Sequence, residues 1–307
     1  MMNITVKSRS GKVAIAGGIN VAESATVDEL KAAIAKARPR LYAARQRLSL
    51  PVKEGQKRGE ALADGAPLSK YGVQEGSVLF LKDLGPQVGY STVFLAEYAG
   101  PLVVYALFYY FPNVLYFWHR GVVPRHPAQT AALAYWCLHY LKRILETLFV
   151  HQFSHATMPI FNLAKNCGYY WGFAAFVSYS VNHPYYVPPP LGRTVSALGL
   201  ALMCQFANLR CHMILANLRP PGSKHYAIPR GFLFDYVTCA NYTAEIWGWI
   251  LFSMATQSLP ALIFTAVGAG QMAIWAAAKH KRLRKMFDGK EGREAYPRRW
   301  IMFPPFF

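Results

Sequence analysis

Acidic residues are scarce in this chain of 307 residues. Asp and Glu number 15 against 33 Lys and Arg, a formal net charge of +18, and the middle of the chain has almost none of them. A nucleic-acid-binding protein would gather its basic residues on one face of a polar domain. Here Lys and Arg collect at the two ends and in two loops, where they flank apolar segments. This distribution is typical of membrane proteins, so we expect membrane lipids and no nucleic acid as partners.

Charged residues of either sign are also few, at 16% of the chain, whereas hydrophobic residues make up 53%. An ordinary soluble domain carries about a quarter charged residues.

The five cysteines show no CxxC or paired spacing, so neither a disulfide framework nor a zinc site is indicated. The polar N-terminus lacks the apolar core of a signal peptide. We therefore expect the first apolar helix to direct the chain into the membrane.

Residues 1–83 are polar enough to form a separate soluble domain. A capping-box pattern from Thr26 to Glu29 predicts a helix that runs to about Ala37. Four segments that alternate polar and apolar residues predict strands: Asn3–Arg9, Lys12–Ala16, Arg47–Val52 and Ser77–Lys82. This order of elements predicts an α+β, ubiquitin-like (β-grasp) domain on the cytosolic side. Its role as a docking module or as a passive appendage stays open.

Residues 84–307 are predicted to form an all-α polytopic membrane domain. Six apolar spans approach the roughly 20 residues that a helix needs to cross a bilayer. We therefore expect six transmembrane helices, or at most seven. An even number would place both basic ends on the same side, the cytosol. The six spans cover about 91–111, 128–150, 167–183, 194–217, 232–255 and 258–278.

Polar side chains inside these apolar spans predict a functional site, because such groups are costly in hydrocarbon unless they face a cavity or each other. In the second span, a helical period places His139, Lys142, Arg143 and Glu146 on one face, with Tyr140 beside it. The alternative is a helix end with an internal Arg143–Glu146 ion pair. The stretch from 208 to 245 is predicted to form one wall of a cofactor and substrate site.

Two motifs match known sites by their letters alone. His151-x-x-x-His155 has the spacing of one histidine box of di-iron membrane enzymes, but the other histidines are scattered and none are adjacent. We therefore predict no metal site. Gly268-x-Gly270-x-x-Ala273 matches a dinucleotide fingerprint but lies inside an apolar span, with no strand before it. We interpret its small residues as a place where two membrane helices approach closely.

Several segments in order along the chain resemble the very-long-chain trans-2-enoyl-CoA reductases of the steroid 5α-reductase superfamily. They are LHYLKRILETLFVHQFSHATMP (138–159), NCGYYWGFA (166–174), LRPPGSKHYAIP (218–229), CANYTAEI (239–246) and YPRRWIMFPPFF (296–307). The resemblance also includes the N-terminal domain and the DLGPQ…VFLAEYAGP junction at 83–101. It implies NADPH-dependent reduction of the C2=C3 double bond of a trans-2-enoyl-CoA, which is the last step of microsomal fatty-acid elongation. It further implies an endoplasmic reticulum membrane location beside the elongase, the ketoacyl-CoA reductase and the hydroxyacyl-CoA dehydratase.

The resemblance also implies roles for individual residues. Glu97 and Tyr140 would hold the thioester carbonyl oxygen. Tyr242 is the first choice for the proton donor, aided by the Lys142 cation, although delivery by Tyr140 stays open. The residues that would bind NADPH are Asn208, His212, Arg219, Lys224, Tyr226, Asn241, Glu245 and His280.

Some positions depart from the enoyl reductase pattern. Ala240 stands where those enzymes usually have Pro and where the steroid branch often has Ala, whereas Tyr242 follows the acyl-CoA branch. Leu283 replaces a common Tyr. A steroid or polyprenol enone reductase on the same scaffold therefore stays open as an alternative. Two further alternatives are a non-catalytic membrane adaptor and a methyltransferase of related architecture.

Overall fold

The computed structural model describes residues 1–153, 156–218 and 226–307. The chain divides into two compact units, which are described separately below. The first consists of Met1–Tyr90 and His155–Asn162, and the second of Ser91–Ser154 and Leu163–Phe307. The domain boundary expected after residue 83 stays a prediction.

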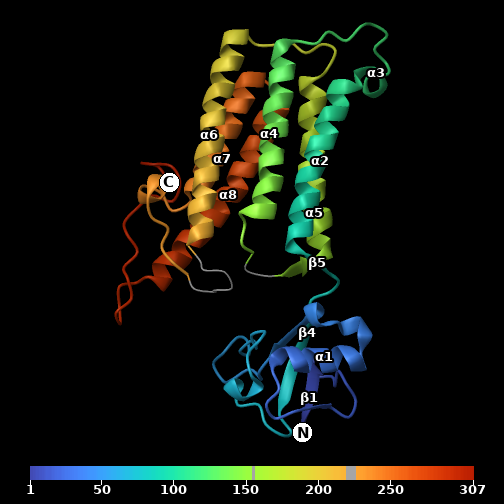
Figure 1. The fold of residues 1–307 in the computed structure, drawn as a ribbon, viewed down its shortest axis with the longest axis vertical. Helices are drawn as coiled ribbons and strands as arrows, with labels where there is room; N and C mark the ends of the chain where they lie inside the picture. Colours follow the sequence, from blue (N-terminus) through green and yellow to red (C-terminus); the bar gives the residue numbers. More distant parts are fainter. Residues whose placement is uncertain (154–155, 219–225) are drawn as a thin grey trace. The chain divides into compact units, whose positions relative to one another are not determined.

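The first unit contains a four-stranded mixed sheet with helix α1 (Val27–Ala37) (Figure 1). The strand order is β2-β1-β4-β3, in which the central pair β1 and β4 is parallel and the outer pairs are antiparallel. This arrangement is compatible with a β-grasp fold. The strands are β1 (Met2–Ser8), β2 (Ile19–Val21), β3 (Gln46–Ser49) and β4 (Val78–Asp83).

The capping box predicted for α1 is confirmed. The Thr26 hydroxyl accepts a hydrogen bond from the Glu29 backbone N–H (3.3 Å), and the Glu29 carboxylate accepts one from the Thr26 N–H (2.7 Å). Such a cap stabilises a helix by about 1 kcal/mol. It sets the start of α1 so that Leu30 and Ile34 are buried in the core of the unit.

The second strand was predicted in the wrong place. Lys12–Ala16 contributes only an isolated bridge, between Lys7 and Val13, and the strand is Ile19–Val21. Gly17 and Gly18 both have positive φ angles, so the chain turns here before it pairs with β1. Pairing β1 with this later segment buries the side chains of Ile19 and Val21.

The second unit is a bundle of long helices (Figure 1). Helix α7 packs against α4, α6 and α8, and α4 also contacts α6. The helices are α2 (Tyr90–Tyr110), α3 (Pro112–Leu115), α4 (Pro127–Phe149), α5 (Ile160–Val181), α6 (Leu191–Asn217), α7 (Ala240–Thr256) and α8 (Leu259–Met286). The second unit also has a 3₁₀ segment at Phe232–Asp235. The first unit has, besides its four-stranded sheet, the 3₁₀ segments Pro39–Leu41, Ala43–Arg45 and Leu68–Tyr71 and the strand pair β5 (Gln87–Gly89) and β6 (Thr157–Pro159).

The prediction of six or seven transmembrane helices is wrong. Among the described residues, three helices are long and apolar enough to cross a membrane: α2, α6 and α8. Helix α7 has only 17 residues, and α4 and α5 carry Lys142, Arg143, Glu146, Lys165 and Asn166. Polar residues that serve the interior of the bundle therefore shorten the apolar length of these helices. The prediction that both chain ends lie in the cytosol assumed an even number of membrane spans, so it no longer has that support.

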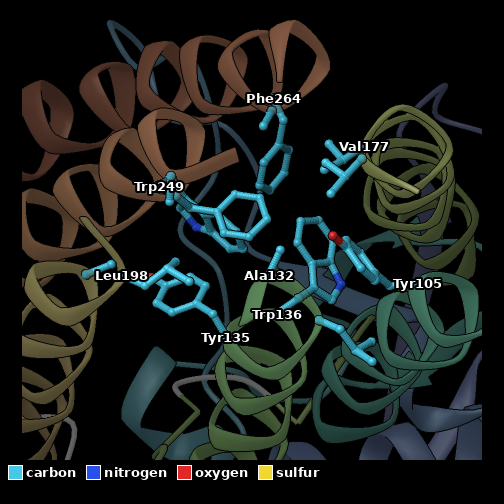
Figure 2. Packing of buried hydrophobic residues seen from close by; sticks show 14 of the residues in the cluster. Tyr105, Ala132, Tyr135, Trp136, Val177, Leu198, Trp249 and Phe264 are labelled. Atoms are coloured by element: carbon cyan, nitrogen blue, oxygen red, sulfur yellow. The ribbon is translucent and has the colours of Figure 1, made fainter. Parts of the chain in front are cut away.

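Aromatic residues form the centre of the bundle around Trp136 of α4 (Figure 2). Its ring centroid lies 4.9 Å from that of Tyr105, 5.3 Å from Trp249 and 6.0 Å from Phe264. The Trp136 indole N–H donates to the Pro101 carbonyl at 3.1 Å. This core joins α2, α4, α7 and α8, and it holds the polar residues on the next turns of those helices in fixed positions.

Candidate functional site

A cavity of about 880 Å³ lies inside the second unit, between α2, α4, α5, α6, α7 and α8. Its volume is within the range of small-molecule and cofactor sites. It brings together seven of the residues predicted from the sequence: Glu97, Tyr140, His212, Tyr226, Asn241, Tyr242 and Glu245.

Glu97 of α2 lies on the cavity wall and is buried. Its carboxylate accepts a hydrogen bond from the Asn166 side chain of α5 at 3.0 Å. The two helices approach closely because Gly100 has no side chain: a Cβ there would lie 1.8 Å from the indole nitrogen of Trp171. Sequence reasoning missed Asn166, although it lies in the NCGYYWGFA segment that carries the family resemblance.

The two tyrosines predicted to act on the substrate both face the cavity. The ring of Tyr140 is buried and lies 6.3 Å from that of Tyr98 and 6.4 Å from that of Tyr170. Tyr242 lies on the first turns of α7 and is partly buried. Within the described residues, neither the Tyr140 nor the Tyr242 hydroxyl makes a hydrogen bond with the protein. Both hydroxyls can therefore serve a ligand.

Arg143 is the cation on this part of the cavity wall. It donates to the Tyr98 hydroxyl at 2.8 Å and to Glu146 at 3.0 Å, and its guanidinium carbon lies 5.0 Å from the centre of the Tyr98 ring. Glu146 also pairs with His212 at 3.0 Å. The predicted polar face of α4 thus carries both an ion pair and cavity-lining residues, and the helical spacing alone did not separate these roles.

Lys142, predicted as the cation beside Tyr242, does not line the cavity. Its ammonium donates to Glu146 at 3.0 Å and to the Asn208 side-chain oxygen at 2.6 Å. Asn208 in turn donates to the backbone carbonyl of Asn241 at 2.9 Å. Lys142 therefore reaches α7 through Asn208, and it links α4, α6 and α7 next to the predicted proton donor.

Glu245 is held by two neighbours on the cavity wall. Its carboxylate accepts from the Trp249 indole N–H at 3.1 Å and lies 3.4 Å from His139 Nε2. The other ring nitrogen of His139 contacts the Gln205 side-chain oxygen at 3.1 Å. His139 and Arg143 line the cavity at an i, i+4 spacing, which places them on one stripe of α4.

Asn241 supplies an unused acceptor. Its side-chain oxygen is buried and has no hydrogen-bond partner among the described residues, although Asn241 lines the cavity. A buried acceptor is costly unless a ligand or water completes it. Lys279 and Arg282 line the same cavity, and the Arg282 guanidinium lies 5.4 Å from the Tyr226 ring centre. A buried amide acceptor and two basic side chains fit a ligand that carries hydrogen-bond donors and phosphate groups.

Among the described residues predicted to bind the cofactor, Asn208 and His280 do not line the cavity. His280 contacts the Thr238 hydroxyl at 2.6 Å, and Tyr296 donates to the same hydroxyl at 3.0 Å. His280 thus secures the C-terminal segment beside α8. Arg219 and Lys224 lie outside the described residues.

A possible donor set for a metal lies beside Arg143. One ligand atom from each of Glu146, His151 and His212 falls within 4.8 Å of the others. Burial and the nearby Arg143 cation lower the pKa of His151 to about 3, so its imidazole is neutral at neutral pH. Lys142 and Arg143 already pair with Glu146 and would repel a divalent ion. The prediction of no metal stays a prediction, and His155 of the histidine motif lies outside the described residues.

Known proteins resemble the chain over its whole length. A very-long-chain enoyl-CoA reductase of Dictyostelium discoideum is 47% identical over 308 residues, which cover all of this chain and 99% of the relative. This chain belongs to the very-long-chain enoyl-CoA reductase family. A probable very-long-chain enoyl-CoA reductase of Caenorhabditis elegans is 46% identical over 90% of this chain and 91% of its own length. A trans-2,3-enoyl-CoA reductase-like protein of Mus musculus is 39% identical over 87% of this chain and 75% of its own length.

A second comparison matches residues 156–307 to the 3-oxo-5-alpha-steroid 4-dehydrogenase family. This match contains all eight residues predicted to bind the cofactor, whereas Glu97, Tyr140 and Lys142 precede it. The resemblance predicted from the sequence is confirmed at the level of the family.

Proposed function

We propose that this enzyme reduces the C2=C3 double bond of very-long-chain trans-2-enoyl-CoA to the saturated acyl-CoA, with NADPH as the reductant. Its place in the enoyl-CoA reductase family supports an oxidoreductase with an acyl-CoA substrate. The observation that carries the proposal is that one cavity brings together the predicted residues from several helices. This cavity combines a buried carboxyl group, two hydroxyls that make no hydrogen bond within the described residues, and a basic end that suits phosphates.

The reaction builds negative charge on the thioester oxygen. Tyr140 and Glu97 lie on the cavity wall where they can hold that oxygen, Tyr140 as the donor and Glu97 as its support. Donors fixed in advance at a developing oxyanion are often the largest contribution to catalysis. The bound nicotinamide would supply the hydride that C3 receives. Tyr242 would then deliver the proton to C2 as a general acid.

The residues present fit the cofactor. The Asn241 side-chain oxygen lacks a partner within the described residues, so it can accept a hydrogen bond from a carboxamide N–H. Glu245 and Asn208 fix the wall around it through Trp249 and through the Asn241 backbone. Lys279 and Arg282 suit phosphate groups by their charge. Arg219, Lys224 and His280 remain proposed cofactor contacts from the family resemblance.

We also propose that the enzyme works in the endoplasmic reticulum membrane beside the elongase, the ketoacyl-CoA reductase and the hydroxyacyl-CoA dehydratase. The three apolar helices support a membrane protein. Cell fractionation of the tagged full chain, followed by co-purification in mild detergent, tests both points. Recovery in another membrane, or without any of the three enzymes, would contradict them.

The reaction is tested by NADPH oxidation with the purified full chain in detergent, with and without a long-chain trans-2-enoyl-CoA. We expect substrate-dependent oxidation and a saturated product. A steroid enone serves as the comparison substrate, because the C-terminal half matches the 3-oxo-5-alpha-steroid 4-dehydrogenase family. Oxidation with the steroid and not with the enoyl-CoA would replace the proposed function with the steroid reaction.

A further inference from the structure

Helix α8 lines the cavity along one continuous stripe. The lining residues run from Phe264 to Leu283, which corresponds to about 28 Å along a helix. One end of the stripe is aromatic, where the Phe264 ring packs against Trp249 at 4.9 Å. The other end carries Lys279 and Arg282. The cavity is therefore long, and its two ends differ in polarity.

The aromatic end of the cavity is closed. The Phe264 ring contacts Tyr169 and Phe173 of α5, with centroid distances of 6.1 and 5.4 Å, and it also contacts Trp136. Phe264, Trp136 and Trp249 belong to the buried core in Figure 2, and Tyr169 and Phe173 pack against it. A ligand chain that starts near Tyr140 therefore cannot continue past Phe264 without displacing the core.

The side of the cavity between α5 and α8 is open. Gly268 and Gly270 line it, and a Cβ added at Gly270 would meet no atom within 4 Å. A Cβ at Gly268 would lie 3.3 Å from the Tyr169 hydroxyl. Val267 and Trp275 line the cavity and are nevertheless 47% and 54% exposed. The cavity thus reaches the surface of α8, one of the three helices suited to cross a membrane.

The cavity is too small to enclose both reactants. Sites of about 300–1,000 Å³ enclose one drug-sized ligand, and this cavity measures about 880 Å³. A nicotinamide dinucleotide together with a very-long-chain acyl-CoA is far larger, so part of the substrate must lie outside. The basic end suits phosphates, which leaves the open apolar side for the hydrocarbon chain.

We propose that the acyl chain leaves the cavity sideways between α5 and α8, over Gly268 and Gly270, and extends into the lipid. The two glycines thereby decide whether long chains are accepted, because a side chain at either position would block the opening. This inference rests on the proposed function and identifies the long acyl chain as the part of the substrate that α8 recognises. The close contact of an added Gly268 Cβ with Tyr169 of α5 is compatible with the interpretation of the Gly268-x-Gly270 motif as a place where two helices approach, whereas Gly270 faces open space.

The test measures kcat/KM for a series from trans-2-hexenoyl-CoA to trans-2-docosenoyl-CoA, with the full chain reconstituted in lipid nanodiscs. Gly270→Leu should lower kcat/KM for docosenoyl-CoA by about tenfold or more. A single methylene group in a hydrophobic pocket already changes kcat/KM by about tenfold or more. The substitution should lower kcat/KM for hexenoyl-CoA far less. The matched control is Gly199→Leu on α6, an exposed helical glycine that does not line the cavity and whose added Cβ also meets no atom within 4 Å. It should leave the whole series unchanged.

A milder pair of variants guards against misfolding. Gly268→Ala should reduce only the long-chain activity, and adding Tyr169→Phe, which removes the hydroxyl 3.3 Å from the new Cβ, should restore it. An unchanged length profile in Gly270→Leu, or an equal loss at every length, would overturn the inference while the active wild type keeps the proposed function. Wild-type protein that is inactive at every length would remove the proposed function and the inference with it.

Discussion

Arg143 of α4 and Tyr98 of α2 form a cation–phenol pair on the cavity wall. The guanidinium donates to the Tyr98 hydroxyl at 2.8 Å and also lies 5.0 Å from the ring centre. The same guanidinium donates to Glu146 at 3.0 Å. Arg143 can hold both partners because its donors form a planar fork, which a lysine ammonium lacks. The pair fixes α2 against α4 next to Glu97 and Tyr140.

Replacing Arg143 by lysine should therefore lower kcat/KM. Hydrogen bonds to charged groups contribute roughly 1.5–3 kcal/mol, so we expect a loss of about tenfold or more. Arg125→Lys is the matched control, because Arg125 lies 4.9 Å from the Tyr109 ring but does not line this cavity. Steady-state kinetics on trans-2-enoyl-CoA checks the prediction. Equal effects of the two substitutions would show that the Arg143 fork has no special role.

Tyr242→Phe should abolish most of the turnover while NADPH still binds. Loss of a general acid typically lowers the rate by about 10²–10⁴-fold. Tyr140→Phe should weaken activity through the thioester oxygen, and Tyr236→Phe, at an exposed position, serves as the control. The kcat of each variant and its NADPH affinity by fluorescence titration distinguish these roles. If Tyr242→Phe retained full turnover and Tyr140→Phe did not, Tyr140 would be the proton donor.

Lys142→Met should weaken cofactor binding more than proton delivery. Lys142 donates to Asn208, and Asn208 donates to the Asn241 backbone, so the substitution loosens the wall that carries Asn241. The Kd for NADPH should rise and the pH dependence of kcat should keep its midpoint. A shifted midpoint with unchanged NADPH affinity would instead favour the prediction from the sequence that Lys142 acts directly on the Tyr242 phenol.

The N-terminal sheet should lose stability in acid. Hydrogen bonding to the Arg45 guanidinium holds the pKa of Asp83 below its ordinary value, and Arg45 Nε donates to Asp83 at 2.9 Å. A carboxyl group with a lowered pKa in the folded state stabilises the fold above its unfolded pKa of about 3.9. That stabilisation is lost as pH falls below this value.

Amide hydrogen exchange in β3 and β4 of the full chain, measured from neutral pH down to pH 3, checks this. Protection should fall with pH beyond the intrinsic effect of pH on exchange. Asp83→Asn should weaken protection at neutral pH and flatten the dependence. An Asp83→Asn profile that matches the wild type would exclude Asp83 as the cause.

Local sequence patterns predicted part of the local structure of this chain. The capping box at Thr26 and the polar groups inside apolar spans are local features, and both have structural counterparts. Which face of α4 meets the cavity depends on how α4 packs against α2 and α6. The sequence therefore favoured Lys142 over its neighbour Arg143. The partner of Glu97, Asn166, lies 69 positions away on another helix and had no local signal.

The number of spanning helices was overestimated for a related reason. Apolar length was counted along the chain, but α4 and α5 use part of their length for residues such as Lys142 and Asn166 that serve the bundle interior. The strand prediction at Lys12–Ala16 was wrong for a different reason. It used only the alternation of polar and apolar residues in that segment, whereas the segment that pairs with β1 is the one that buries Ile19 and Val21.

The most direct test of the account is the destination of the transferred hydrogen atoms. The purified wild type would receive NADPH carrying deuterium at the transferable position, with a long-chain trans-2-enoyl-CoA, and the product would be analysed by mass spectrometry and NMR. The account predicts cofactor deuterium at C3 and, in a separate reaction in deuterated water, solvent deuterium at C2. Cofactor deuterium at C1 or C2, or a product without it, would contradict hydride addition to C3.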